Sequence, residues 1–194
     1  MKRVLLVSAA VLNICAINAL AQKDSSGIYK TVADFQLGKL SYAINYKTQT
    51  HSINDNLMFN NSEVKVKHEG TTYSLKKSDV YGYRDMNGVD FRFVDNKAYK
   101  IMTRTKGLIT LYVYKSQKQG TKGTSEQVSE YYFSKDIGSQ PQALTKDNLK
   151  AAYPDNHKFH DALDANFKED KELAEYDSFH KMYKVNHILS MNSQ

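Results

Sequence analysis

Apolar and polar residues alternate along much of the first 140 residues, which predicts β-strands there. The clearest case is Val89–Lys115, which contains two or three strands in close succession. These runs are Val89–Val94, Ala98–Met102 after the turn sequence Asp95-Asn96-Lys97, and Leu108–Tyr114 after Lys106-Gly107. Leu108–Tyr114 is apolar on both faces, so we expect it to be a central strand that is covered on both sides.

Shorter alternating runs predict further strands. They are Lys39–Asn45, Glu63–Lys67, Thr72–Lys76, Val80–Arg84 and Val128–Ser134. The two strands on either side of Glu69-Gly70 are expected to form a hairpin with one solvated face. Asn87-Gly88 is the strongest hairpin-turn dipeptide in the sequence. Ser116–Ser125 has no apolar residue, which predicts a polar hairpin tip. Thr31 is expected to cap a short helix that ends at Gly38.

The last fifty residues change to helical periodicity. Thr145 is the predicted N-cap of a first helix that Pro154 ends. A second helix buries Phe159, Ala162, Leu163 and Phe167 on one face. A third helix is expected from Asp170, with one stripe that carries Leu173, Tyr176, Phe179, His180, Tyr183 and His187.

Strands followed by helices are typical of an α+β fold. We expect an antiparallel meander of about seven to nine strands, or a partly closed barrel, followed by two to three C-terminal helices. Residues 22–194 are predicted to form a single domain, mainly β over 22–143 and mainly helical over 144–190. A hydrophobic content of 41% and a charged content of 25% fit a globular protein of this kind.

The first 21 residues have the pattern of a signal peptide. A positive start at Lys2 and Arg3 precedes a mostly apolar run, and Ala19-Leu20-Ala21 is a cleavage site before Gln22. The apolar run is too short and too interrupted for a transmembrane anchor. The alternative of a lipid anchor through Cys15 is disfavoured because Ile14, a large residue, precedes it.

Export and charge narrow the partners that we expect. Cys15 is the single cysteine, so a mature chain is free of disulfides and of cysteine-bound metals. The net charge of +6 falls to +4 when the signal is removed. This excess is too small for a nucleic-acid-binding protein, whereas an envelope protein, a glycan or a lipid remains a suitable partner.

Histidines are the best candidates for chemistry. His157, His160 and Asp164 fall on one side of the second helix and could hold zinc or iron if a further ligand joined them. The alternative is a partly exposed polar edge of the helix, because the pattern lacks the glutamate of H-E-x-x-H. His180 and His187 lie in the stripe of the third helix beside Asp177 and Ser178, and we expect them at the edge of the core.

Two other sets of residues are weaker candidates. Asp79, Asp85 and Asp90 could be paired carboxylates of a glycosidase, although turn aspartates are far commoner. Tyr81, Tyr83 and Arg84, with Tyr131 and Tyr132, could present rings and a guanidinium to a partner. The alternative for the tyrosines is the preference of this residue for half-buried strands.

Several strings in the sequence resemble a group of small exported proteins of Gram-negative bacteria that have no assigned activity. They are Gly27-Ile28-Tyr29, Asp34-Phe35, Gly38-Lys39-Leu40, Asp79–Asp85, Pro154–Asp161 and Tyr176–Asn186. The resemblance would cover nearly all of the mature chain. It implies export to the periplasm or beyond, and it transfers no catalytic residue.

We therefore expect an exported binding or accessory protein for a protein, glycan or lipid partner, without enzymatic activity and without a cofactor. The alternative is a metal-dependent or hydrolytic enzyme that uses His157, His160 and Asp164. A third interpretation is an accessory subunit whose tyrosine-rich face is covered only in a complex.

Overall fold

The computed structural model describes residues 25–45, 47–49, 53–54, 61–105, 108–119 and 125–192. These residues have the predicted α+β fold, with an eight-stranded sheet, two smaller sheets and helices near the C-terminus. Every strand pair with a described register is antiparallel. The predicted signal peptide, residues 1–21, and Cys15 lie outside the described residues.

The eight-stranded sheet has the strand order β11-β10-β9-β8-β7-β6-β1-β2. Its strands are β1 (Ser25–Tyr29), β2 (Ser41–Asn45), β6 (Gly82–Arg84), β7 (Asp90–Val94), β8 (Lys97–Thr103), β9 (Thr110–Gln119), β10 (Ser125–Ser134) and β11 (Gln142–Ala143). The order ends at β2 and β11, which do not pair with each other. The structure thus has the predicted antiparallel meander and is not a closed barrel, because closure requires the two edge strands to pair.

The contacts divide the chain into two compact units, one up to Ala98 and one from Tyr99 onward. In the first unit β1 lies between β2 and β6. A second sheet contains β3 (Ile53–Asn54), β4 (Glu63–His68) and β5 (Thr71–Lys76), and a 3-10 helix, η2 (Lys77–Asp79), follows. The buried core of this unit comprises Ile28, Val64, Val66, Val80, Tyr83, Phe93 and Ala98. The predicted one-sided hairpin is confirmed, because Val64 and Val66 are buried while Lys65 and Lys67 are exposed.

Helix α2 (Val32–Leu37) has the predicted caps. The Thr31 hydroxyl accepts a hydrogen bond from the Asp34 amide at 3.0 Å. Gly38 ends the helix with φ 66°, a left-handed conformation that suits glycine. Phe35 is fully buried and packs edge-on against Tyr29, with ring centroids 5.1 Å apart.

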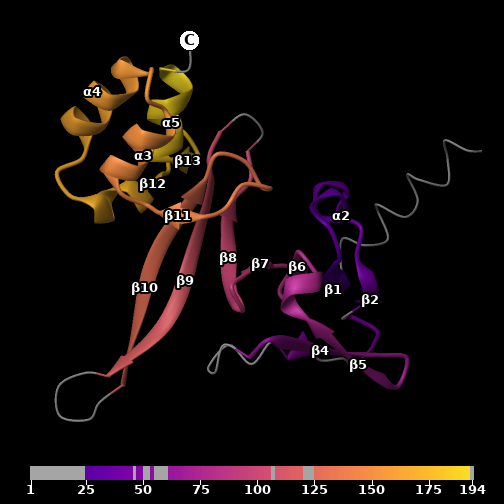
Figure 1. Cartoon of the computed structure of the whole chain (residues 1–194). Helices are drawn as coiled ribbons and strands as arrows, with labels where there is room; N and C mark the ends of the chain where they lie inside the picture. The colour runs from indigo at the N-terminus through magenta and orange to yellow at the C-terminus, as the bar shows by residue number, and fades with distance from the viewer. Residues whose placement is uncertain are drawn as a thin grey trace, which may run out of the picture. The chain divides into compact units, whose positions relative to one another are not determined.

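The second unit is a long β9–β10 hairpin with helices gathered at one end (Figure 1). The helices are α3 (Lys146–Ala152), α4 (His157–Asn166) and α5 (Lys184–Met191), with a 3-10 helix, η4 (Asp170–Ala174), between the last two. Successive side chains of a strand point to opposite faces. Leu111 and Phe133 face the helices and share a core with Phe159, Leu163 and Leu173, among others. The opposite face carries Tyr99, Tyr112, Tyr114 and Tyr132, whose rings are in contact. The predicted central position of Leu108–Tyr114 is confirmed, because β9 lies between β8 and β10.

The predicted polar tip at Ser116–Ser125 is partly wrong. Strand β9 continues to Gln119 and pairs in register with β10 from Ser125 onward. Backbone hydrogen bonds make this ladder, so polar side chains on both faces do not interrupt it. The rest of the predicted tip, residues 120–124, lies outside the described residues.

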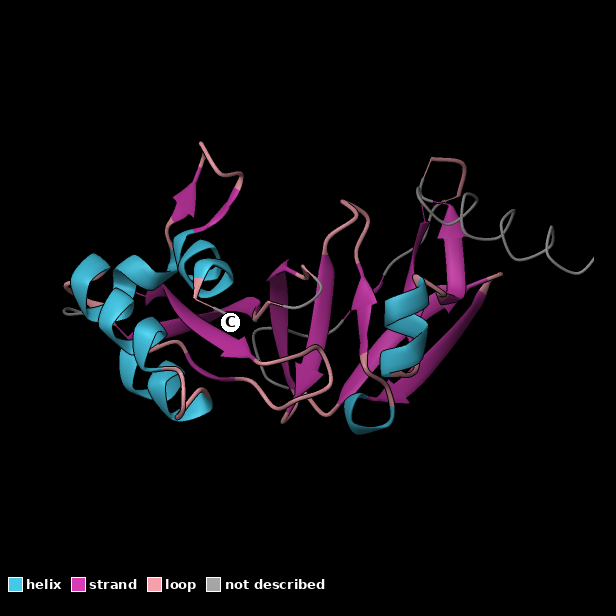
Figure 2. Cartoon of the chain, turned by 90° about the horizontal axis from the view of Figure 1, so that it is seen from above, coloured by secondary structure: helices cyan, strands magenta, loops and turns pink. Residues whose placement is uncertain are grey.

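The predicted third helix is present only from Lys184 onward, and its predicted beginning at Asp170 is wrong. The chain forms η4, then a hairpin of β12 (Tyr176–Asp177) and β13 (Met182–Tyr183), and only then α5. The Asp177 carboxylate accepts bonds from the amides of Phe179 and His180, at 2.8 and 3.1 Å, which satisfies those donors outside a helix. Lys181 has φ 54°, which a helix does not allow. Figure 2 shows this short hairpin standing out from the helices of its unit.

Candidate functional site

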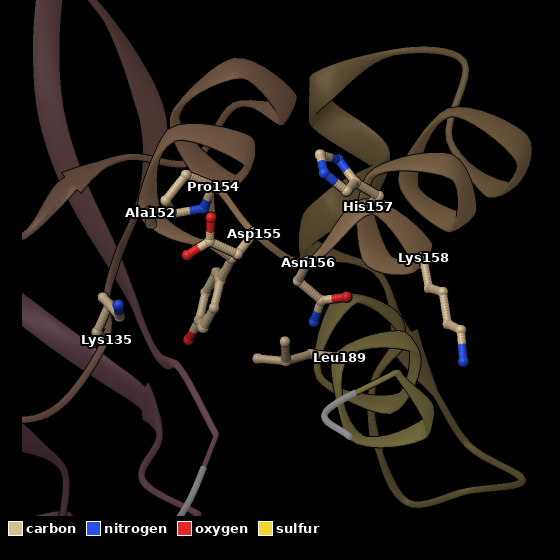
Figure 3. Close-up of a pocket in the computed structure, with 9 residues that line it drawn as sticks. Lys135, Ala152, Pro154, Asp155, Asn156, His157, Lys158 and Leu189 are labelled. Carbon is tan, nitrogen blue, oxygen red and sulfur yellow. The ribbon is translucent and has the colours of Figure 1, made fainter.

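A cleft of about 710 Å³ opens in the second unit, where α3 ends and α4 begins. It is lined by Lys135, Ala152, Tyr153, Pro154, Asp155, Asn156, His157, Lys158 and Leu189. Figure 3 shows Lys135 on one side of Asn156 and Lys158 on the other, and Leu189 extending from α5. Its volume lies within the range of roughly 300–1,000 Å³ that is typical of ligand pockets.

Tyr153 is the aromatic residue of the cleft. Its backbone amide ends α3 by bonding to Leu149 and Lys150 carbonyls, and its carbonyl accepts a bond from His160 Nε2 at 2.8 Å. Phe159 packs against the ring edge-on at 5.6 Å. Burial raises the pKa of the Tyr153 phenol, and the Asp136 carboxylate raises it further. The hydroxyl therefore stays protonated at neutral pH and can donate a hydrogen bond to a ligand.

Charged groups of both signs surround this ring. The Lys135 ammonium lies 4.8 Å from the centroid of the Tyr153 ring, within the range of a cation–π contact. Asp155, His157 and Lys158 are exposed side chains at the start of α4. The cleft can thus offer hydrogen-bond donors and acceptors beside an aromatic ring.

Asn156 fixes the segment that bears these side chains. Its Oδ1 accepts a bond from the Phe159 amide at 3.0 Å and caps α4, while its Nδ2 donates to the Asn192 carbonyl at 2.8 Å. The predicted end of the first helix near Pro154 is confirmed, and the cap of the next helix is Asn156. Because the side-chain amide of Asn156 joins the beginning of α4 to the end of α5, the segment that lines the cleft is held in place before a ligand binds.

The structure brings His157 and His160 together but keeps Asp164 apart from them. The two rings are edge-to-face with centroids 5.7 Å apart. His160 Nε2 donates to the Tyr153 carbonyl, so this nitrogen has no lone pair for a metal. Asp164 instead pairs with Lys150 at 2.7 Å and Lys146 at 3.6 Å, and the Lys150 hydrogen bond lowers the pKa of the carboxyl group. Within the described ranges no group of three or more His, Cys, Asp or Glu is placed to hold a metal ion.

Tyr81 and Tyr83, proposed as partner-binding residues, are buried, with 8% and 5% of their surface exposed. Arg84 is bound within the unit: its Nε and Nη2 donate to the Asp90 carboxylate at 2.8 and 3.1 Å, and the Tyr29 hydroxyl donates to the same group at 2.9 Å. A partner could not reach the two rings without opening the core. These residues therefore support the fold of the first unit.

Replacing Arg84 with methionine should lower the free energy of unfolding by about 1.5–3 kcal/mol, because a half-buried carboxylate loses two charged hydrogen bonds. Urea denaturation measures the change. Lys65→Met, an exposed position of β4, is the matched control and should change stability by less than about 0.5 kcal/mol. Equal effects of the two variants would contradict a structural role for Arg84.

The three aspartates considered for glycoside cleavage each have a local role. Asp85 accepts bonds from the amides of Asn87 and Val89 in a turn, and Asp79 accepts one from the Ser78 hydroxyl. Asp90 holds Arg84. The described contacts therefore favour structural roles for these carboxylates.

His180 and His187 form a second cluster, away from the cleft lining. Their rings stack with centroids 3.8 Å apart, and His180 Nδ1 donates to Asp177 at 2.7 Å. The hydrogen bonds from His180 lower the pKa of Asp177 to about 2. In the described part of the chain Ser178 makes no hydrogen bond to either ring, so the cluster does not show the nucleophile–base contact that a serine hydrolase needs.

Comparison with known proteins gives no match to a protein-family model, to a curated protein or to a solved structure. No described helix combines the length and the apolar character needed to cross a membrane. The geometry of the cleft and of the surface is therefore the basis for a functional hypothesis.

Proposed function

We propose that this chain is an exported binding protein, without enzymatic activity, that holds a saccharide unit in the cleft beside Tyr153. The observation that carries the proposal is the lining of the cleft, where one aromatic ring adjoins side chains of both charges. The sequence pattern of a signal peptide supports export.

A saccharide suits this lining for chemical reasons. A sugar ring presents C–H groups on its faces and hydroxyl groups around its edge, and each hydroxyl both donates and accepts hydrogen bonds. Tyr153 and Leu189 offer apolar contact. Lys135 can donate, Asp155 can accept, and the protonated Tyr153 hydroxyl can do either.

Other ligand classes fit less well. The acyl chain of a lipid would need a longer apolar wall than Ala152, Pro154, Leu189 and one ring provide. A protein partner normally meets a broad surface of about 800 Å² per side, whereas this site is concave and local. The alternative of an enzyme lacks support, because His160 and Asp164 are bound to other groups.

The test is titration calorimetry of the mature chain with N-acetylglucosamine, galactose, glucuronic acid and their disaccharides. Tyr153→Leu keeps apolar contact with Phe159 but removes the ring and the hydroxyl, and Lys135→Ala removes the ammonium. Each variant should weaken binding of the best saccharide by about tenfold or more, equal to about 1.4 kcal/mol. Tyr176→Ala, a tyrosine that does not line the cleft, should bind as the unaltered chain does.

Three outcomes would overturn the proposal. They are the absence of binding to every saccharide tested, equal binding by Tyr153→Leu and the unaltered chain, and turnover of the sugar. Thermal melts of each variant would show that it is folded.

A further inference from the structure

A second, smaller pocket of about 140 Å³ lies in the first unit. Ile44 of β2 contributes apolar surface to it, and Gln49 comes from the loop after this strand. The other lining residues, from the end of β4 and the turn to β5, are Lys67, His68, Glu69 and Gly70. The pocket is below the range of roughly 300–1,000 Å³ of drug-sized sites and has room for about five water molecules. A ligand that fits it must therefore be small.

His68 gives the pocket a polar ring that is not fully satisfied. Its Nδ1 is buried and has no hydrogen-bond partner among the described residues. Its Nε2 lies 3.8 Å from Glu69 Oε1, which is too far for a hydrogen bond. Buried polar atoms without partners are rare in folded proteins and destabilise the free chain. A polar ligand atom beside this ring would reduce that cost.

An irregularity in β2 directs an aromatic ring toward His68. The register of β1 with β2 shifts at Gly27, where β2 has one extra residue. Tyr42 has φ 52°, a left-handed conformation that is strained for an aromatic residue. Its ring packs on Tyr73 at 4.7 Å and edge-on to His68 at 6.0 Å. Bulges that redirect a side chain and strained backbone both occur preferentially at functional sites.

Apart from the histidine, the lining carries one ammonium and one carboxylate. Lys67 and Glu69 are both exposed, and within the described ranges Lys67 forms no ion pair. Thr72, the residue opposite Lys67 on β5, is uncharged. Lys67 would attract a simple anion while Glu69 repelled it, and a simple cation would meet the reverse. A ligand that carries both charges satisfies both side chains.

We propose that this pocket binds a zwitterionic α-amino acid of the size of glycine, alanine or serine. The α-carboxylate pairs with Lys67 and the α-ammonium with Glu69, while the Gln49 amide donates to one group or accepts from the other. The short side chain of the ligand faces Ile44. The pocket and the cleft beside Tyr153 belong to different units and share no residue. Amino-acid binding is thus an activity separate from saccharide binding.

Titration of the mature chain with L-alanine, followed by NMR of the backbone amides, tests the proposal. Because the two charged side chains are exposed, we expect a dissociation constant on the order of 1 mM and titrate to about 20 mM. L-Alanine should shift the amide resonances of Gly70 and Gln49. Propionate and ethylamine each carry one of the two charges and, at equal ionic strength, should bind about tenfold more weakly or worse.

Two variants test the assigned roles. Lys67→Met and Glu69→Gln each remove one charge and should weaken L-alanine binding by about tenfold. Lys65→Met is the matched control, because Lys65 is an exposed lysine of the same strand that does not line the pocket. It should bind L-alanine as the unaltered chain does. All three altered side chains are exposed, so the melting temperatures should be unchanged.

Absence of L-alanine binding at the highest concentration would overturn the proposal. Equal affinity for propionate would overturn it too, because the pocket would then be a site for simple anions, and so would unchanged binding by Lys67→Met. Saccharide titration of Lys67→Met separates this proposal from the function of the cleft. Since the cleft lies in the second unit, this variant should bind saccharides as the unaltered chain does, and the two proposals can fail independently.

Discussion

Replacing Phe159 with alanine is expected to lower the free energy of unfolding of the second unit by about 3–5 kcal/mol. Phe159 is fully buried and lies in the core between the helices and the β9–β10 hairpin. Its ring also supports Tyr153 edge-on. Alanine would leave a cavity at the centre of this core, and Tyr153 would lose the surface against which it packs.

Chemical denaturation monitored by circular dichroism measures this loss. Asp161→Ala is the matched control on the same helix, because its side chain is exposed and is not part of the cleft. It should change stability by less than about 0.5 kcal/mol. If Phe159→Ala cost no more than the control, the described core of the second unit would be incorrect.

Replacing Gly82 with alanine should destabilise the first unit by about 3 kcal/mol or more, among the larger effects of a single substitution. A Cβ at this position would lie 2.0 Å from the Phe91 carbonyl oxygen and 3.0 Å from the Arg92 Cα. Both are backbone atoms of the neighbouring strand, so no side chain can move to relieve the clash. The β6–β7 pairing must separate instead, and β1 pairs with the other side of β6.

Hydrogen exchange locates this effect. The Phe93 amide, which donates to the Tyr81 carbonyl at 2.9 Å, should exchange much faster in Gly82→Ala than in the unaltered chain. Gly138→Ala is the control, because the nearest atom to its Cβ is a side-chain oxygen of Asp136 at 3.3 Å. Preserved protection of Phe93 in Gly82→Ala would rule out the close approach of the two strands.

The strands could be predicted where burial and alternation agree. Val64 and Val66 are buried between exposed lysines, and the pairing of β4 with β5 follows that pattern. The ends of β9 and β10 could not be predicted in the same way, because polar side chains on both faces leave only backbone bonds to define the strands. The helix predicted from Asp170 failed for a different reason. Tyr176 and Phe179 are exposed, so the helical spacing of these residues does not reflect a buried face.

The cleft was only partly predictable. Histidine spacing drew attention to the beginning of α4, and His157 does line the cleft. Lys135 follows directly after β10 and Leu189 lies in α5, and no local pattern links residues so far apart in the sequence. The ion pairs of Asp164 could not be predicted from local spacing either, because Lys146 and Lys150 lie on a different helix.

The position of β1 between β2 and β6 has a consequence for the order of folding. β9 and β10 are joined by a short connection, so they can pair early and locally. By contrast, β1 pairs with β6, where Ile28 lies opposite Tyr83, and these two residues are far apart in the sequence. β1 therefore gains its second partner strand only after the chain through β6 has folded. Refolding of the first unit should therefore be slower than that of the second, and the Ile28 amide should be among the last to become protected.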